Sequence, residues 1–373
     1  MSDAVVTRSD VEDAATRVAA VIRPTPVAAA DALSKVVGRP VLLKPEHRQR
    51  TGSFKIRGAY NLISRLDPAV TPAVVAASAG NHAQGVALAA HRAGIPATIF
   101  MPTSVSLPKL QATRDYGASV ELVAGNVEDA IAAALAHADA TGAVWVHPFD
   151  DPRIQAGQGT IGLEIDAEAP DAEVVVVPVG GGGMITGIAA ATDKRVVGVR
   201  PADTRATMAD GIAVRDSLAI AQEVVTVSEE DISRAVLLLL ERAKAVVEPA
   251  GAVGLAALLG GAVPGDGPVV VVLSGGNVDP MLLTRIVEHG LTAAGRYLVL
   301  TVILADRPGQ LAALSATIAD LGANVLSIEH HRTGIRLGFG DALVRLTLEA
   351  RDHAHGDELV TALRAAGFTV DRG

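Results

Sequence analysis

The chain has 373 residues, of which 49% are apolar, enough for the cores of two or three domains. Its net charge of -9 argues against a nucleic-acid partner, and the lack of cysteine excludes disulfides and thiolate chemistry. A chain without cysteine suits the reducing cytoplasm, and the polar start MSDAVVTRSDVEDAATR has no apolar signal segment. We therefore expect a cytoplasmic protein.

From residue 40 onward, β-branched runs alternate with alanine-rich stretches, a pattern typical of a mostly parallel sheet covered by helices. Strands are predicted at residues 40–44, 73–78, 97–101, 119–124, 173–178, 195–199 and 268–274, and helices at 84–93, 126–141 and 229–245, among others. Residues 174–192 carry no charge, but Pro178 and four consecutive glycines exclude a continuous membrane helix there. The expected fold class is α/β, without a membrane span.

The last part of the chain has a different pattern, which predicts a second domain. Strands are expected at 297–304, 323–331, 342–350 and 368–371, with helices at 309–321 and 355–366. This order of strand, helix, strand, strand, helix, strand indicates a ferredoxin-like α+β unit. Residues 290–297 are the predicted linker, which places the domains at 1–295 and 296–373.

The stretch TGSFKIRGA, residues 51–59, places Lys55 in the first turn of a predicted helix. Thr51 or Ser53 can cap this helix, and its buried face has apolar residues at helical spacing: Ala59, Leu62, Ile63 and Leu66. A cation there opposes the helix dipole, which favours a lowered pKa and an amine able to form a Schiff base. For a single lysine the commoner alternative is an ordinary surface residue, so other motifs must decide.

Three polar, glycine-containing loops follow predicted strands. Residues 180–183 are four glycines between a strand and a helix, and their N–H groups can bind a phosphate, which we favour over a plain tight turn because such a turn seldom needs four glycines. The loop SAGNHAQG, 78–85, offers N–H groups for a carboxylate, or is a capped turn with Ser78 or Asn81 as N-cap. The third loop is LSGGN, 273–277. Together they indicate a ligand crevice at one sheet edge.

These segments resemble, in order, those of the fold-type II pyridoxal-phosphate enzymes, and within them the threonine dehydratases. The resemblance is carried by TGSFKIRGAYN, ASAGNHAQGVA, HPFDDPRIQAGQGTIGLEI, PVGGGGMITGI, ADGIAV, VEPAGAVGLAALL and LSGGNVD. It implies a tryptophan synthase β-like fold of two open twisted sheets, with a small subdomain at about 73–148. The segments DRPGQLAAL and GANVLSIEHHR resemble ACT domains, which bind amino-acid effectors.

The resemblance also implies roles for individual residues. Lys55 would hold pyridoxal 5'-phosphate as a Schiff base, with Phe54 against the pyridine ring. The cofactor phosphate would lie on Gly180, Gly181, Gly182, Gly183 and the N–H of Met184. Asn81 would bind the 3'-oxygen of the ring, and Ser274 the pyridine nitrogen. The substrate carboxylate would be framed by the loop residues Ser78, Ala79, Gly80, Asn81 and His82.

The implied reaction is β-elimination of L-threonine to 2-oxobutanoate and ammonia, with L-serine giving pyruvate. A serine racemase is the first alternative, but it needs a second acid/base, which that family supplies as a serine at the position of Ala79, where this chain has only a methyl group. Another fold-type II lyase, a β-replacement synthase and a catalytically weak effector-binding protein are further alternatives.

Regulation, metal binding and assembly are also addressed by the resemblance. Relatives often have a metal-binding carboxylate where this chain has Arg200, and the segment up to ADGIAV, 209–214, is short, so no metal is predicted. Isoleucine or valine is the expected effector at residues 306–309, against the alternative of a packing module without ligand. A homodimer or homotetramer is expected, whereas a biosynthetic role in isoleucine formation and a catabolic role both stay open.

Overall fold

The computed structural model describes residues 5–203, 207–209, 223–332 and 338–372. The chain forms two compact units, Met1–Leu283 and Thr284–Gly373. Among the described residues, no helix combines the length and apolar character needed to cross a membrane. The uncharged stretch 174–192 is a strand, a glycine loop and a helix, as its sequence predicts.

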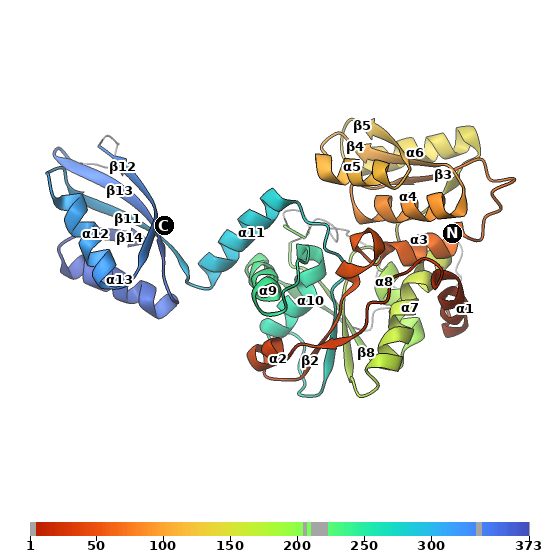
Figure 1. Ribbon diagram of the computed structural model, residues 1–373, viewed down its shortest axis with the longest axis horizontal. Coiled ribbons are helices and arrows are strands. Elements are labelled where there is room, and N and C mark those ends of the chain that lie inside the picture. The colour runs from red at the N-terminus through yellow and green to blue at the C-terminus, as the bar shows by residue number, and fades with distance from the viewer. Residues whose placement is uncertain (1–4, 204–206, 210–222, 333–337, 373) are drawn as a thin grey trace. The chain divides into compact units, whose positions relative to one another are not determined.

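The larger sheet of the first unit is parallel except for its first strand. In spatial order its strands are β1 (Ala28–Ala29), β2 (Val41–Lys44), β10 (Val269–Val272), β7 (Val174–Pro178), β8 (Arg195–Pro201) and β9 (Val224–Val227). Every residue of β7 and β10 is buried, because helices cover both faces of the sheet. Figure 1 shows these helices: α1 (Arg8–Val18), α2 (Asp31–Val37), α7 (Pro152–Glu168), α8 (Gly183–Ala191), α9 (Glu229–Arg242) and α10 (Pro249–Leu259).

The first unit also contains a second, smaller sheet, which is wholly parallel. Its strands, in spatial order, are β5 (Ser119–Val123), β4 (Ala97–Pro102), β3 (Val74–Ala77) and β6 (Val144–Trp145). Its helices are α4 (Asn81–Ala93), α5 (Leu107–Asp115) and α6 (Val127–Thr141). Two open parallel sheets confirm the predicted fold class, and all seven predicted strands occur within two residues of their expected bounds.

Helix α3 (Lys55–Ile63) packs between α4 and α7, and so joins the two sheets. Two glycines permit the approach of α3 to α7, because a Cβ atom on Gly157 would lie 2.6 Å from the Cα of Gly58. Contact of the backbones at this point keeps the helices rigidly packed. The first residue of α3 is Lys55, so this packing also places the lysine.

The start of α3 differs from the prediction, because neither Thr51 nor Ser53 caps the helix. The N-cap is Phe54, whose backbone N–H donates to the carbonyl of Ser274 at 3.1 Å. Ser53 is extended and forms a bridge with Gly275, so the loop after β10 takes over the role expected of a side-chain cap. The predicted buried residues Ala59, Leu62 and Ile63 do lie in the core.

Three further boundaries differ from the prediction. Helix α4 begins at Asn81 after an N-cap at Gly80, because the side chain of Asn81 bonds to Glu248 and not to its own backbone. Helix α9 ends at Arg242, since Lys244 adopts a left-handed conformation with φ 54°. The predicted linker is partly helical, because α11 (Pro280–Ala293) continues into it. Strands β1, β6 and β9 were not predicted.

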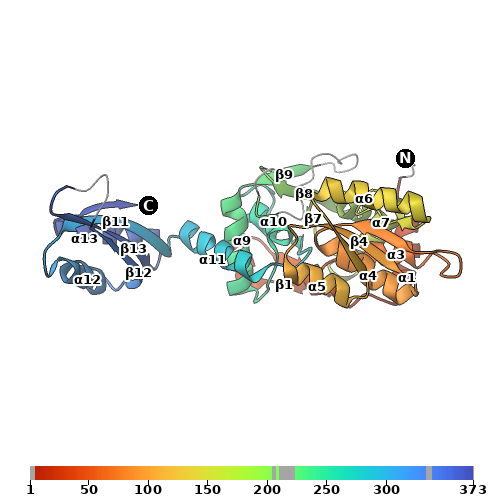
Figure 2. The ribbon, with the colours of Figure 1, turned by 90° about the horizontal axis from the view of Figure 1, so that it is seen from above.

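The second unit has the predicted ferredoxin-like topology. Its antiparallel strands, in spatial order, are β12 (Asn324–His331), β13 (Asp341–Glu349), β11 (Tyr297–Ala305) and β14 (Thr369–Arg372). Burial alternates along β13, so one face of the sheet is covered, and helices α12 (Gln310–Asp320) and α13 (His353–Ala365) form the layer that packs with it (Figures 1 and 2).

Candidate active site

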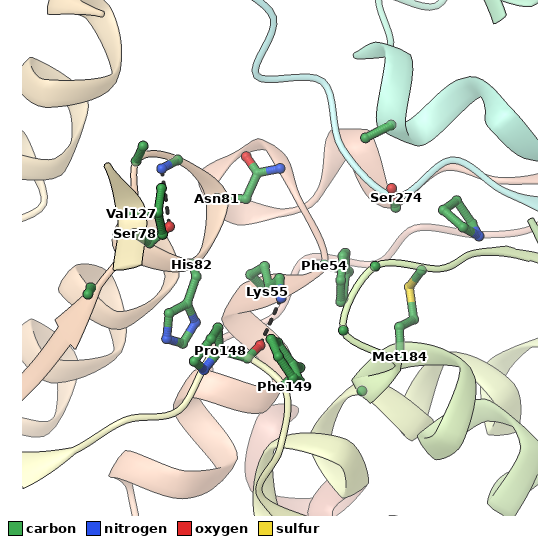
Figure 3. A pocket seen from close by; sticks show the side chains of 18 of the residues that line it. Phe54, Lys55, Ser78, Asn81, His82, Val127, Pro148, Phe149, Met184 and Ser274 are labelled. Carbon is green, nitrogen blue, oxygen red and sulfur yellow. Dashed lines mark hydrogen bonds between the residues drawn. The ribbon is translucent and has the colours of Figure 1, made fainter. Parts of the chain in front are cut away.

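A cavity of about 710 Å³ in the first unit is lined by loops and helix ends from both sheets (Figure 3). Every residue to which the sequence assigned a role in the site lies on its wall: Phe54, Lys55, Ser78, Ala79, Gly80, Asn81, His82, Gly180, Gly181, Gly182, Gly183, Met184 and Ser274. Other lining residues were not singled out from the sequence, among them Lys109, Glu128, Phe149 and Glu248. We call this space the active-site cavity.

Lys55 carries a buried amine that is held by a backbone acceptor. Its Nζ donates a hydrogen bond to the carbonyl of Pro148 at 2.8 Å and lies 5.2 Å from the ring centroid of Phe54 (Figure 3). Burial lowers the pKa of Lys55 to about 8, and the negative charge of Glu248 opposes that shift. The sequence predicted a lowered pKa from the helix dipole, whereas burial is its main cause.

We expect Lys55 to make the stability of the cofactor-free protein depend on pH. The unfolded chain keeps an ordinary lysine pKa near 10.5, whereas the folded chain has one of about 8, so the unfolded chain binds the extra proton between these values. The loss of folding stability that comes from burying the charged amine is therefore fully present below pH 8 and disappears toward pH 10.5. Allowing for the part of the side chain that faces the open cavity, it amounts to about 2 kcal/mol.

Urea unfolding of the wild type and of Lys55→Met, both without cofactor, measures this cost. At pH 7 the variant should be about 2 kcal/mol more stable, and the two proteins should converge near pH 10.5. The wild type serves as the control for all other titrating groups. A stability difference that stayed constant over this pH range would contradict the lowered pKa.

The glycine loop opens helix α8 and provides uncapped N–H groups. Gly182 has φ 86°, a left-handed conformation that suits glycine, and no side chain caps the helix. The loop is packed on Phe149, because a Cβ atom on Gly181 would lie 2.2 Å from that ring and one on Gly183 would lie 2.8 Å from the Phe149 carbonyl. N–H groups at a helix start that faces a cavity can bind a phosphate.

Replacing Gly181 with alanine should disturb this loop and weaken binding of pyridoxal phosphate about tenfold to a hundredfold, since the methyl group forces the loop away from Phe149. Titration of the cofactor-free protein, followed by absorbance, measures the affinity. Gly260→Ala is the matched control, because the nearest atom to its new methyl group is 3.5 Å away. Equal affinities for both variants would refute the role of the loop.

The loop before α4 presents polar groups to the cavity. The hydroxyl of Ser78 accepts a hydrogen bond from the N–H of Gly80 at 3.2 Å. His82 is buried, and its Nε2 donates to the carbonyl of Val146 at 2.9 Å. Burial, aided by the charge of Lys55, lowers the pKa of His82 to about 3. The imidazole is therefore neutral at physiological pH.

Ser274 and Glu248 complete the cavity wall on the side of the larger sheet. Ser274 follows β10, is 4% exposed, and lies one residue before Gly275, whose carbonyl accepts from the N–H of Glu248 at 3.0 Å. Glu248 also accepts from Asn81 Nδ2 at 2.7 Å. Sequence reasoning missed Glu248, and its only signal was its place in the segment VEPAGAVGLAALL.

The residues present fit pyridoxal 5'-phosphate. The fit depends on a buried amine of lowered pKa, an uncapped glycine-rich helix start and a buried serine hydroxyl on the wall of one cavity. Phe54 adds an aromatic ring beside the amine. The cavity is also large enough for a cofactor with a small substrate.

Comparisons with known proteins agree with this site. The pyridoxal-phosphate dependent enzyme family matches residues 18–275, and the ACT domain family matches residues 298–368. An L-threonine ammonia-lyase from Thermotoga maritima is 44% identical, over 98% of this chain and 99% of that protein. The solved structure of a threonine deaminase from T.th. has 36% identity and a TM-score of 0.68, over 73% of this chain and 99% of that chain. Maize serine racemase has 30% identity and a TM-score of 0.72, over 76% and 97%.

The fold, the cavity and these matches define a fold-type II pyridoxal-phosphate dependent enzyme that also carries an ACT domain. The cofactor of this class is pyridoxal phosphate. Within the class, the chain belongs to the L-threonine ammonia-lyase family, with which it aligns over nearly its whole length.

The segment considered for a metal is only partly described. Arg200 lies in strand β8, at the position for which the family resemblance implies a metal-binding carboxylate in many members. Of the segment ADGIAV, only Ala209 is among the described residues, and residues 210–214 lie outside them. The prediction of no metal therefore stays a prediction.

Proposed function

We propose that this chain catalyses the elimination of water from L-threonine, that hydrolysis of the resulting enamine gives 2-oxobutanoate and ammonia, and that L-serine gives pyruvate and ammonia in the same way. The observation that carries this function is the buried amine of Lys55, with its pKa of about 8, in the same cavity as the glycine loop. A pKa near the working pH provides both a neutral and a protonated form of one group, as acid/base catalysis requires. The threonine ammonia-lyases at 44% identity support the choice of substrate.

The cofactor supplies an aldehyde for the amino group of the substrate and a ring that withdraws electrons from its α-carbon. Lys55 would hold it covalently between turnovers, and the neutral amine of Lys55, once released, would take the α-proton of the substrate. His82 is not the acid for the leaving hydroxyl, because a group with a pKa of about 3 carries no proton to donate as a cation at neutral pH. It instead fixes the loop through its bond to Val146.

The remaining residues orient the reactants. Residues 180–184 and 78–82 line the cavity, where the N–H groups of the former would bind the phosphate and those of the latter the substrate carboxylate. Asn81 would bind the 3'-oxygen of the ring, and Phe54 would lie against the ring. Ser274 would meet the pyridine nitrogen with a hydroxyl instead of a carboxylate, which would leave that nitrogen largely unprotonated and favour elimination over transamination.

Incubation of the purified holoenzyme with L-threonine or L-serine, followed by identification of the keto acid, tests the proposal. We expect 2-oxobutanoate from threonine and pyruvate from serine. Absence of a keto acid from both amino acids would refute the function and favour a catalytically weak effector-binding protein. A substituted amino acid formed after addition of a thiol would instead reveal a synthase.

A racemase is the alternative that the fold of maize serine racemase raises. Racemisation needs a proton donor on the face of the α-carbon opposite to Lys55, and the residue in question, Ala79, lines the cavity with only a methyl group. We therefore expect L-serine to yield pyruvate without D-serine, as measured by chiral chromatography. Formation of D-serine at a rate comparable with pyruvate would favour the racemase.

For the second unit, we propose regulation by isoleucine or valine through residues 306–309, between β11 and α12. Asp306 in this turn accepts from Arg332 Nε at 3.1 Å, so the turn already carries a charged pair. A titration with each amino acid should change the threonine kinetics or the melting temperature. No change in either would leave the ACT domain as a packing module.

The same proposal covers the oligomeric state, the cellular location and the domain bounds. We propose a cytoplasmic homodimer or homotetramer, with a catalytic domain at 1–295, a small subdomain at about 73–148 and a regulatory domain at 296–373. Sedimentation analysis of the holoenzyme determines the oligomer size. Growth of a deletion strain without isoleucine distinguishes a role in isoleucine biosynthesis from a catabolic one.

A further inference from the structure

The carboxamide of Asn81 is held from two sides by residues far away in the sequence. Its Nδ2 donates to Glu248 Oε1 at 2.7 Å, and its Oδ1 accepts from Asn277 Nδ2 at 2.8 Å. An ionised carboxylate only accepts hydrogen bonds, so the amide nitrogen must face Glu248 and the amide oxygen must face Asn277. Two partners of opposite character therefore select one of the two orientations of the amide.

The orientation of Asn277 is itself determined by the backbone. Its Nδ2 also donates to the carbonyl of Thr51 at 2.6 Å, and a carbonyl oxygen only accepts. Asn277 therefore cannot turn its oxygen toward Asn81 without losing this bond. The side chain fits closely, because a Cβ atom on Gly52 would lie 2.3 Å from Asn277 Oδ1.

Thr51 adopts an unusual backbone conformation that also needs this contact. Its φ of 64° lies in the left-handed region, which is unfavourable for a β-branched residue. Such a conformation persists only where the surroundings determine it, and here Asn277 binds the Thr51 carbonyl while the N–H of Gly276 binds the Gly52 carbonyl at 2.9 Å. Asn277 thus ties the turn before Lys55 to the start of helix α4.

The Asn81 carboxamide nitrogen carries two N–H groups, and the bonds described above use only one of them. Within the described part of the chain, its only hydrogen-bond acceptor is Glu248, and Asn81 lines the active-site cavity. Turning the amide over would exchange this donor for an acceptor. The difference matters for the 3'-oxygen of the cofactor ring, which carries negative charge and requires a donor.

We propose that Glu248 and Asn277 are positioning residues that hold the Asn81 carboxamide with an N–H available to the 3'-oxygen of bound pyridoxal phosphate. The inference rests on the proposed function, because it assumes the cofactor orientation given there. Loss of either partner frees the amide to turn, so that part of the population presents an oxygen to the ring oxygen. Both the affinity for the cofactor and its visible spectrum should then change.

The test uses Asn277→Asp, which has the shape of asparagine but has no N–H group to donate to Thr51 or Asn81. Titration of the cofactor-free protein with pyridoxal phosphate should show affinity weaker by about tenfold. The pH midpoint of the visible absorbance of the bound cofactor should also shift, which loss of packing alone would not produce. The control is Gln84→Met, because it removes only the longest bond that Asn277 Nδ2 donates, at 3.4 Å to Oε1 of buried Gln84, and leaves the bonds to Thr51 and Asn81 in place.

Three further variants keep the proposal falsifiable if Asn277→Asp does not fold. Asn277→Ala leaves space instead of a repulsive acceptor, so it should weaken binding less and still shift the pH midpoint. Glu248→Gln keeps an acceptor for Asn81 and should retain most of the affinity, whereas Glu248→Met should lose about tenfold. Wild-type affinity and pH midpoint in folded Asn277→Ala and Glu248→Met would overturn the proposal. These binding measurements do not depend on turnover, so they stand apart from a failure of the proposed reaction.

Discussion

Lys55→Ala should lower the formation of 2-oxobutanoate from threonine by about 10³-fold or more, because in the proposed mechanism one amine both holds the cofactor and takes the α-proton. The fold should survive, because the variant loses one hydrogen bond to the Pro148 carbonyl but also removes an amine whose charged form is destabilised by burial. A coupled assay for the keto acid measures the activity, and thermal unfolding of the cofactor-free protein measures the fold.

Lys35→Ala is the control for this prediction, because Lys35 is exposed on helix α2 and lies outside the active-site cavity. It should retain wild-type activity. Borohydride reduction gives a second readout, since it should attach the cofactor to the peptide that contains Lys55 in the wild type and not in Lys55→Ala. Undiminished turnover by Lys55→Ala would exclude the assigned role.

Arg57→Leu should cost about 3–5 kcal/mol of the free energy of unfolding, because it leaves the buried carboxylate of Glu46 without its cation. Arg57 is fully buried and binds both oxygens of Glu46 at 2.8 Å, and it also binds Glu164 at 2.6 and 2.8 Å. Burial alone would lower the pKa of Arg57, but the two carboxylates more than reverse this and raise it. Glu164 keeps a second cation, Lys44, at 2.6 Å, whereas Glu46 pairs with no other cation among the described residues.

Urea unfolding at pH 7 measures the effect of Arg57→Leu. The control is Arg65→Ala, just beyond the end of α3, where the guanidinium binds Asp13 at 2.9 Å and both side chains are partly exposed. Surface pairs of this kind contribute less than about 1 kcal/mol. If both variants lost similar stability, the ion pairs of Arg57 with Glu46 and Glu164 would contribute no more than an ordinary surface pair.

Most strands and the approximate place of the site could be predicted, because the signals are local. The runs at 173–178 and 268–274 are almost wholly β-branched, which indicates buried parallel strands, and both strands are found there. Four glycines after a strand leave few alternatives to an anion-binding turn. The predicted caps at Thr51 and Ser53 were wrong, because the loop at Ser274 and Gly275, more than 200 residues away in sequence, binds the helix start instead.

The residue types at the site and their order along the chain are properties of the sequence: a lysine at a helix start, glycines after a strand, a serine after another. Tertiary structure alone decided their chemistry. The pKa of Lys55 falls because folding removes water from its amine. The Asn81 amide is oriented by Glu248 and Asn277, which lie 167 and 196 residues away in the chain. Local patterns cannot encode such contacts, since they arise only when loops from two sheets close around one cavity.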